Sequence, residues 1–323
     1  MARRYIPEAV RDGLREEMAR DPDVVLLGED IKISPYGFER GLYDEFGPER
    51  VRNTPIAEQT MAGVGLGAAA CGLRPVVDMF FGNFLYTGMD QLANQVAKLR
   101  YMTGGQIKVP VVYLAVMGAG SNVAAQHSDS PHPLFMNLAG IKVVIPTTPA
   151  DAKGLIRSAI RDDDPVLFLV PTPLLGVRGE IPDEEYLTPV GVAEIRQQGS
   201  DVTIVGIGST VREALRATRQ FERDGISIEV IDVRTVHPLD TATILRSVAK
   251  TGRLVVTDEA RELCSAASEI AAIVVERGFR SLKAPVRRVT APNVPVPFSP
   301  PLEKFVMVSA EKIANAIRQV IDY

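Results

Sequence analysis

The chain has 323 residues, which allows one large domain or two medium domains, each with its own buried core. Its composition, with 46% hydrophobic and 24% charged residues, is typical of a globular enzyme or enzyme subunit. A net charge of −4 with scattered Lys and Arg residues argues against nucleic-acid binding, and two distant cysteines argue against a disulfide scaffold or a zinc ribbon.

Short apolar runs alternate with helical patterns through the first half of the chain. Near-continuous apolar runs of this kind are typical of strands in a parallel sheet that is covered on both faces. Thr54 and Thr148 are the predicted N-caps of two helices, each followed by a proline at the first helical position. The pattern predicts strands that begin near Val24, Arg74, Val109, Ile141 and Pro165, and helices over 8–20, 55–72, 89–101 and 149–161.

The stretch 171–200 is rich in Pro, Gly and charge, and we interpret it as a surface connector. After it the alternation restarts, with strands in "DVTIVGIGS", "ISIEVIDVR", "RLVVTDEA" and "VRRVTAP" and helices between and after them. This order predicts an α/β fold with two doubly wound domains. We expect them over residues 1–180 and 195–323, joined by a linker over 181–194.

The charged N-terminus does not resemble a secretory signal, and the most apolar run, Met61 to Leu73, is too short to span a bilayer. Cys71 and Cys264 form no CxxC pair. Together these features predict a cytoplasmic protein.

The stretch "NTPIAEQTMAGVGLGAAACG" places Glu58 at the head of a helix face that continues through Ala62, Gly65, Ala69 and Gly72. Glycines inside a helix cost roughly 1 kcal/mol each relative to alanine, so they require a reason such as close approach of another backbone or a flat ligand. The alternative is that Glu58 is an exposed first-turn acid favoured by the helix dipole. The spacing alone leaves both interpretations open.

The stretch "AAQHSDSPH" contains His127 and His132 in an H-x-D-x-x-H pattern. His127 and His132 are five positions apart, so they would not lie on the same face of a helix. A first-row metal usually recruits further His or Cys ligands, so a metal site is disfavoured. A histidine in a loop after a buried strand is better placed for proton transfer, because such loops form the ligand crevice of parallel sheets. A structural histidine remains the alternative.

The stretch "AIRDDDPV" places three acids after a predicted helix. It is either a solvated turn or an oxygen-rich cation site, and the sequence alone does not decide between them.

Several ordered motifs together resemble the β subunit of the thiamine-diphosphate-dependent 2-oxo acid dehydrogenases. They are "RNTPIAEQ", "LRPVVDMFF", "MDQLANQVAKLRYMTGGQ", "AAQHSDSP", "GIKVVIPTTPADAKGLIRSAIRDDDPV" and "VIDVRTVHPLD". The resemblance runs from about Ile6 to the C-terminus. It implies a transketolase-like fold, in which a pyrimidine-binding domain is followed by the transketolase C-terminal domain.

The resemblance also implies roles for individual residues. Glu58 matches the glutamate that hydrogen-bonds N1′ of the aminopyrimidine of thiamine diphosphate and so promotes proton removal from the thiazolium ring. Ile56 and Phe84 match residues that contact the pyrimidine, and Glu29 matches an acid near the passage between paired active sites. His127 matches the histidine that handles protons or meets the lipoyl group. The small residues on the face of Glu58 are expected to leave room for subunit packing.

Four further residues match positions around a potassium ion in related β subunits. They are Val111, Ala159, Asp162 and Asp164. In this family the diphosphate is bound through Mg²⁺ held by a G-D-G motif and an asparagine on another chain, and here the nearest strings are "RDG" at 11–13 and 223–225. We therefore expect an α subunit that carries the Mg²⁺, in an α₂β₂ heterotetramer, and a dihydrolipoyl acyltransferase with its lipoyl domain as the acyl acceptor.

Departures from the family pattern leave the substrate open. Thr87 stands where pyruvate-specific members tend to have glutamine, and Val170 replaces a common glutamate. The leading hypothesis is oxidative decarboxylation of a 2-oxo acid. The alternatives are acetoin cleavage or acyloin formation, and a scaffold subunit without catalytic activity.

Overall fold

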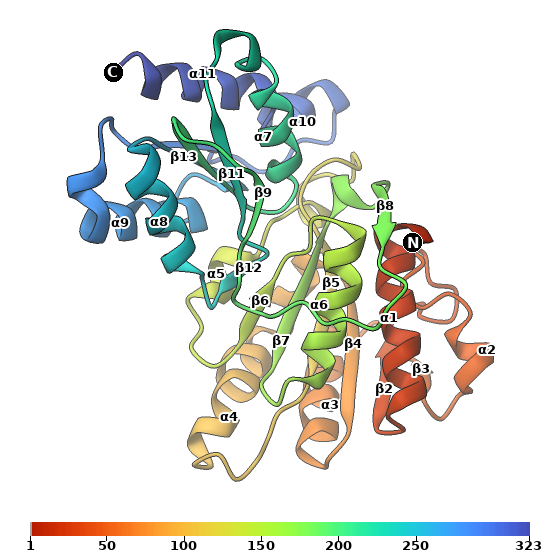
Figure 1. Cartoon of the computed structure of the whole chain (residues 1–323). Helices are drawn as coiled ribbons and strands as arrows, with labels where there is room; N and C mark the ends of the chain where they lie inside the picture. Colours follow the sequence, from red (N-terminus) through yellow and green to blue (C-terminus); the bar gives the residue numbers. More distant parts are fainter. Residues whose placement is uncertain (1) are drawn as a thin grey trace. The chain divides into compact units, whose positions relative to one another are not determined.

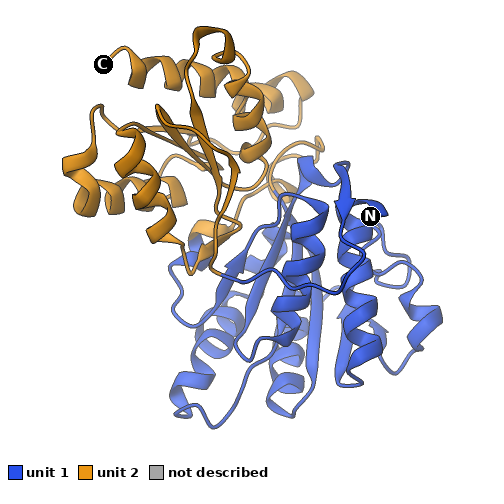
Figure 2. Ribbon diagram, viewed as in Figure 1, with its two compact units in different colours: residues 1–117, 134–190 blue, residues 118–133, 191–323 orange. Residues whose placement is uncertain are grey.

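The computed structural model describes residues 2–323 and divides into two compact units (Figures 1 and 2). Unit 1 consists of the chain up to Met117 together with Leu134–Val190. Unit 2 consists of Gly118–Pro133 and Gly191–Tyr323.

Unit 1 is built on a parallel sheet with the strand order β6-β7-β5-β4-β2-β3. Its central strands β5 and β7 are buried at every residue, which explains their uninterrupted apolar sequences. The bounds are β2 (Val24–Gly28), β3 (Val51–Asn53), β4 (Arg74–Phe81), β5 (Val112–Met117), β6 (Lys142–Val144) and β7 (Val166–Pro171).

Helices cover this sheet, and two of them are tied together by buried charge. In the contact between α1 and α6, the fully buried Glu17 accepts hydrogen bonds from Arg157 and Arg161. The helices and connecting turns are α1 (Ile6–Arg20), α2 (Leu42–Phe46), α3 (Glu58–Ala70), a 3₁₀ segment Gly82–Tyr86, a π-helical segment Gln91–Val96, α4 (Ala97–Met102), α6 (Pro149–Arg161) and a 3₁₀ turn Thr172–Leu174. The short helix α5 (His132–Met136) begins in unit 2 and ends in unit 1.

Unit 2 has a five-stranded sheet with the order β14-β13-β10-β11-β9, in which only β9 is antiparallel to its neighbour. Its strands are β9 (Glu194–Gln197), β10 (Val202–Gly206), β11 (Ile228–Asp232), β13 (Leu254–Arg261) and β14 (Arg287–Ala291), with a short β12 (Thr235–His237) outside this sheet. Its helices and 3₁₀ turns are Ala125–His127, α7 (Thr210–Thr218), Glu222–Asp224, α8 (Thr241–Thr251), α9 (Ala266–Gly278), Phe279–Ser281, α10 (Pro300–Val306) and α11 (Ala310–Ile321).

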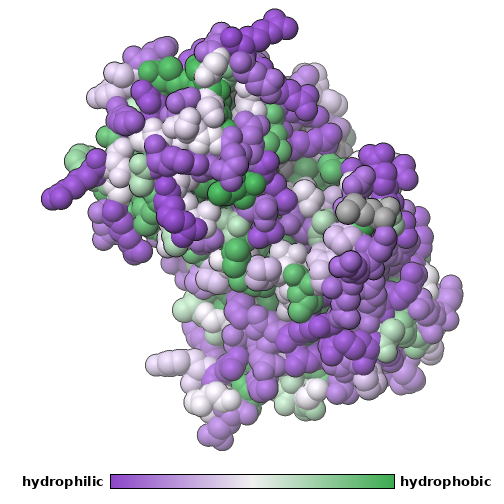
Figure 3. All heavy atoms as spheres, in the orientation of Figure 1, coloured by the Kyte–Doolittle hydropathy of each residue, from purple (hydrophilic) through white to green (hydrophobic). Residues whose placement is uncertain are grey.

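The surface in the view of Figure 3 is mostly hydrophilic, with scattered hydrophobic side chains. Among residues 2–323, no helix is long and apolar enough to cross a membrane.

The predicted alternation of strands and helices is observed in both units, but the predicted division of the chain differs from the observed units. Residues 118–133 group with unit 2, because Asp129 and His132 pair with Arg261 and Asp258 of that unit. The border after the first sheet lies between Val190 and Gly191, inside the expected linker.

The interpretation of 171–200 as a surface connector is wrong in part. The segment contains β8 (Arg178–Ile181), which pairs in antiparallel fashion with β1 (Ala2–Tyr5), and also β9. Polar edge strands of this kind lack the long apolar run on which the prediction relied.

The predicted start of α3 is also wrong. The amide of Thr54 donates to the carbonyl of Gly28 at 2.9 Å, which extends the pairing of β3 by one residue. Consequently the chain is still extended at Thr54, and the helix begins at Glu58 with Ala57 as its N-cap. By contrast, α6 begins at Pro149 as predicted, and the hydroxyl of Thr148 accepts the amide of Asp151 at 3.1 Å.

Candidate active site

The carboxyl ends of β2 and β4 bring several acids of unit 1 to one edge of the sheet. Glu29 directly follows β2, Asp78 lies in β4, and Glu58 is the first residue of α3. Glu58 is half-buried, so its carboxylate is neither sealed in the core nor fully in solvent. Carboxyl ends of parallel strands are where open α/β sheets bind their ligands.

The surroundings of Glu29 at this edge disfavour the charged form of its carboxyl group. Its Oε1 atom is buried without a hydrogen-bond partner. Burial raises the pKa of Glu29, and the nearby charges of Glu58, Asp30 and Asp78 raise this pKa further. A buried oxygen without a donor is rare in a folded protein, and it indicates a place where a ligand or partner can supply that donor.

A second pair of buried acids, Glu39 and Asp78, was not found from the sequence. Both side chains are almost fully buried, and Glu39 accepts a hydrogen bond from the hydroxyl of Ser34 at 2.8 Å. Burial raises the pKa of Asp78 to about 6, and burial together with the charge of Asp78 raises the pKa of Glu39. The amide of Phe80 donates to Asp78 Oδ1 at 2.8 Å, where β4 bulges and Phe80 has a φ of +64°.

Aromatic rings cluster beside these acids. Phe84 packs edge-on against Phe81, with ring centroids 5.4 Å apart, and Tyr36 contacts both Phe80 and Phe81. Ile56, between β3 and α3, is 80% exposed. An isoleucine this exposed leaves an apolar surface that a ligand or a partner chain can cover.

The face of α3 headed by Glu58 packs on its own sheet. An added Cβ at Gly65 would lie 2.7 Å from Cγ2 of Val77, and the hydroxyl of Tyr113 donates to the carbonyl of Ala62 at 2.7 Å. The expectation that these small residues leave room for another subunit is therefore wrong, because the sheet of the same unit fills that space. The exposed face of α3 carries Thr60, Val64, Gly67 and Ala70 instead.

The four residues of the predicted potassium site lie in unit 1, but their oxygen atoms already have partners. Lys142 donates to Asp162 at 2.6 Å and pairs with Asp164 at 3.1 Å, and Arg100 binds the other oxygen of Asp164. The carbonyl oxygen of Val111 accepts a hydrogen bond from the amide of Val166, and that of Ala159 accepts one from the amide of Asp162. The carbonyl oxygen of Asp162 accepts a hydrogen bond from the side chain of Arg74.

These ion pairs leave the two aspartates with little negative charge for a metal ion. Burial alone would lower the pKa of Lys142, but Asp162 and Asp164 raise it above its ordinary value. A monovalent cation at this place would have to displace a charged lysine. The residues present therefore do not fit a potassium ion.

His127 lies in unit 2, within the 3₁₀ turn Ala125–His127, and is half-buried. Its loop has an unusual backbone, since Asn122 and Ala124 have φ values of +55° and +63°. Residues with a Cβ rarely adopt this conformation, and such strain concentrates at functional sites. Glu58 and His127 thus belong to different units, and each is placed within its own unit.

His132 has a structural partner. Its Nε2 atom lies 3.0 Å from Oδ1 of Asp258, and both side chains are fully buried. Among the described residues, no group of three or more His, Cys, Asp or Glu side chains is arranged to hold a metal ion. The H-x-D-x-x-H pattern therefore separates into a half-buried His127 and a buried, paired His132.

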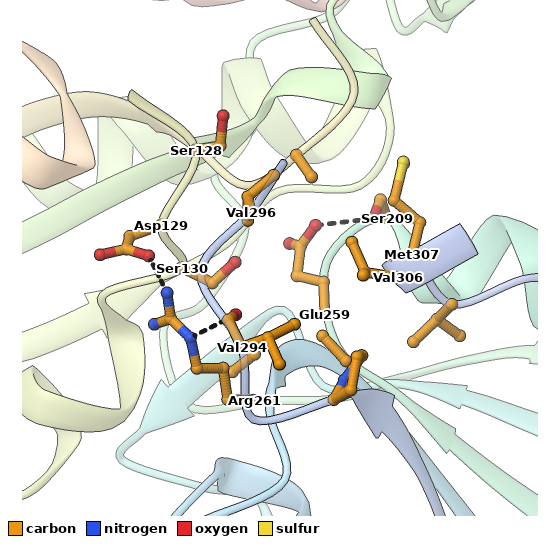
Figure 4. A pocket seen from close by; sticks show the side chains of 15 residues that line it. Ser128, Asp129, Ser130, Ser209, Glu259, Arg261, Val294, Val296, Val306 and Met307 are labelled. Carbon is orange, nitrogen blue, oxygen red and sulfur yellow. Dashed lines mark hydrogen bonds and ion pairs between the residues drawn. The ribbon is translucent and has the colours of Figure 1, made fainter. Parts of the chain in front are cut away.

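A cavity of about 40 Å³ lies in unit 2 beside the same loop (Figure 4). Glu259 accepts a hydrogen bond from Ser209 at 2.7 Å, and Arg261 reaches Asp129 at 2.6 Å. The other oxygen of Glu259 is buried without a partner, and burial raises the pKa of Glu259 to about 7. The cavity is large enough for ordered water but not for a substrate.

Two domain models match the chain. The pyrimidine-binding domain of transketolase matches residues 5–177, and the C-terminal domain of transketolase matches residues 191–313. Curated relatives match along almost the whole length. The beta subunit of acetoin:2,6-dichlorophenolindophenol oxidoreductase of Cupriavidus necator is 44% identical, covering 99% of this chain and 98% of the relative.

Two beta subunits of Bacillus subtilis also match along almost the whole length of this chain. That of 2-oxoisovalerate dehydrogenase is 40% identical over 98% of both chains, and that of the pyruvate dehydrogenase E1 component is 42% identical over the full length of both. The chain belongs to the E1 β-subunit family. An inactive β4 tetramer of a split-gene transketolase shares the fold of this E1 β chain, with a TM-score of 0.81, 24% identity and 98% coverage of both chains.

Proposed function

We propose that this E1 β chain supplies Glu58 and His127 to a thiamine-diphosphate site that an α subunit completes. The family is thiamine-diphosphate dependent, and the chain is an oxidoreductase β subunit. The observation that carries the proposal is the pair Glu29–Glu58. Glu58 stands at the head of α3 within electrostatic reach of Glu29, whose Oε1 has no donor.

The residues at this edge fit the pyrimidine half of the cofactor. The half-buried carboxyl group of Glu58 can share a proton with a ring nitrogen, and Phe84 and the exposed Ile56 offer apolar surface to a flat ring. When bound, thiamine diphosphate would supply nucleophilic carbon chemistry toward the carbonyl group of a 2-oxo acid. Within this chain, Glu58 holds the proton of the ring nitrogen, the apolar side chains exclude water, and His127 transfers a proton or meets the lipoyl group.

The diphosphate half of the cofactor is expected on a second chain. The sequence has no G-D-G motif followed by an asparagine, so the Mg²⁺ that holds the diphosphate would come with the α subunit. The exposed face of α3 supports such a partner, because Val64 is 51% exposed and an added Cβ at Gly67 would meet no atom within 4 Å. We propose an α₂β₂ heterotetramer that passes the acyl group to the lipoyl domain of an acyltransferase.

We propose oxidative decarboxylation of a 2-oxo acid as the reaction. The β chain would be co-expressed with its α chain and assayed with pyruvate, branched-chain 2-oxo acids and acetoin. Turnover of a 2-oxo acid with reduction of a lipoyl domain supports the proposal, and turnover of none of these substrates by the assembled complex contradicts it.

Acetoin cleavage is the second candidate. It is favoured by the 44% identity to an acetoin oxidoreductase beta subunit, although the identities to the 2-oxo acid dehydrogenase subunits, 40% and 42%, are close to it. Preference for acetoin over every 2-oxo acid in the same panel would decide for this alternative.

A potassium ion is not part of the proposal, since Lys142 and Arg100 pair with the carboxylate oxygen atoms of Asp162 and Asp164. The cytoplasmic location also stays a prediction, motivated by two exposed, unpaired cysteines.

A further inference from the structure

The loop 118–133, which carries His127, is held in unit 2 by charged groups along its length. Near its start, the amides of Gly120 and Asn122 donate to the carboxylate of Glu303 on α10, at 2.9 and 3.1 Å. Glu303 is only 3% exposed. A buried carboxylate that accepts two amides fixes the backbone where it would otherwise be mobile.

Near the end of the loop, β13 provides two further anchors. Asp129 pairs with Arg261 at 2.6 Å, and its carbonyl accepts the amide of Gly118 at 2.9 Å, which closes the loop on itself. Three residues later His132 pairs with Asp258. The turn that contains His127 therefore lies between an anchor on α10 and two anchors on β13.

The His132–Asp258 pair is the most deeply buried of these anchors. Asp258 also accepts the amides of Ala260 and Ala267, at 2.9 and 3.3 Å. Burial raises the pKa of Asp258, but His132 and the two amides outweigh it, so the pKa lies below its ordinary value. An ionised Asp258 only accepts hydrogen bonds, so Nε2 of His132 carries the hydrogen and donates it. Nδ1 of His132 has no partner.

Glu259 supports the loop from beneath. An added Cβ at Gly118 would lie 3.0 Å from Oε2 of Glu259, so the loop backbone rests against this carboxylate. Removing the donor from His132 would leave the buried charge of Asp258 with only two amide donors, which is unfavourable unless the surroundings rearrange. The loop backbone is strained at Asn122 and Ala124, so its conformation depends on the anchors that hold it.

We propose that His132 and Asp258 are positioning residues for His127, which keep the loop in the strained conformation that presents His127 to its reaction partner. This inference rests on the part of the proposed function in which His127 meets the lipoyl group. Both residues of the His132–Asp258 pair lie in unit 2. His132, which in the sequence suggested a metal site, instead serves as an anchor of the loop. Loss of the anchor should impair the step that uses His127 more than the earlier steps.

The test uses the complete complex of α and β chains with thiamine diphosphate and Mg²⁺. Two rates are measured for each variant, one with a lipoyl domain as acceptor and one with 2,6-dichlorophenolindophenol as an artificial acceptor. The ratio of the two rates is the readout, because a general folding defect lowers both rates together. A misplaced catalytic group costs roughly 10- to 100-fold, so His132→Leu should lower this ratio about tenfold or more.

Two further variants keep the test decisive. His132→Gln retains an N–H donor toward Asp258 and should restore part of the ratio. Arg261→Gln releases Asp129 at the partly exposed anchor and should lower the ratio in the same direction, and it decides the matter if His132→Leu does not assemble.

His127→Ala separates this inference from the proposed function. If His127→Ala lowers the ratio while His132→Leu and Arg261→Gln leave it unchanged, the positioning role is wrong and the proposed function stands. If His127→Ala itself leaves the ratio unchanged, His127 does not act in the transfer to the lipoyl group, and the positioning role falls with it.

Discussion

The carboxylate of Glu58 raises the pKa of Glu29, whose Oε1 is buried without a hydrogen-bond partner. This arrangement of Glu29 and Glu58 destabilises the isolated chain at neutral pH, because burial and the charge of Glu58 both oppose ionisation of Glu29. A ligand or partner that brings a donor would relieve the repulsion. The site is thus arranged for binding at the expense of stability, as functional sites often are.

Glu29→Gln should therefore stabilise the isolated β chain. A folded-state pKa above the unfolded value means that the stability supplied by Glu29 is present at acid pH and is lost as the pH rises. The gain in melting temperature for Glu29→Gln should accordingly be larger at pH 8 than at pH 5. Glu184→Gln, at an exposed carboxylate, is the matched control and should show no such difference. An equal or negative shift at both pH values for Glu29→Gln would contradict the electrostatic account.

The buried pair Glu39–Asp78 predicts a second pH dependence. The pKa of Asp78 is raised to about 6, so its contribution to stability is greatest below the unfolded value and is lost as the pH rises through about 6. Asp78→Asn removes the ionisable group and with it the loss of stability at high pH. The Oδ1 atom of the asparagine can still accept the hydrogen bond from the amide of Phe80. The variant should be more stable than wild type at pH 8, by on the order of 2 kcal/mol.

Asp232→Asn provides the contrast for Asp78. Asp232 Oδ1 accepts the amide of Arg234 in the same way, but its Oδ2 pairs with Arg196 at 2.8 Å. Loss of that ion pair should destabilise the protein at pH 8. Denaturant unfolding of both variants over a pH series measures the difference, and destabilisation by Asp78→Asn at pH 8 would contradict the raised pKa that burial gives Asp78.

The exposed face of α3 predicts an effect on assembly alone. Gly67→Leu adds a side chain where no atom lies within 4 Å and improves helix propensity, so the isolated chain should be at least as stable as wild type. If the α subunit covers this face, its dissociation constant should rise about tenfold or more, roughly 1.4 kcal/mol. Gly176→Leu, at another exposed glycine with open space, should leave the affinity unchanged.

The ion pairs at Asp162 and Asp164 predict no requirement for potassium. A ligand that binds only the folded state raises the melting temperature. Because we expect no potassium ion to bind, equal concentrations of KCl and NaCl should give the same melting temperature for the wild-type chain. Lys142→Ala removes the cation that occupies both aspartates, and this variant should be less stable in either salt. A selective rise in KCl for the wild type would reinstate the predicted potassium site.

The sequence predicts most of the fold because its signals are local. Buried strands such as β5 and β7 are continuous apolar runs, and the cap of α6 is formed by Thr148 with Pro149 after it. The cap predicted at Thr54 failed because a tertiary contact, the pairing of its amide with Gly28, overrides the local pattern. The edge strands β1 and β8 are polar and carry no periodic signal.

The site was predicted less completely, because its missing members are defined by partners far away in the sequence. Glu39 and Asp78 are ordinary acids until the fold buries them together, and His132 is explained by Asp258, 126 positions later. The motif "RPVVDMFF" was a clue for Asp78, since an acid inside an apolar strand requires a partner. The residue patterns singled out Glu58 and His127, but the resemblance was needed to assign each of them a role.

The activity of Glu58→Gln in the assembled complex tests the account most directly. The variant keeps the size and the hydrogen-bonding capacity of the side chain but cannot hold the proton of the pyrimidine nitrogen. We predict that it assembles with the α subunit and loses at least about 100-fold in the rate of 2-oxo acid turnover with either acceptor. Turnover at the wild-type rate by an assembled Glu58→Gln complex would contradict the central claim.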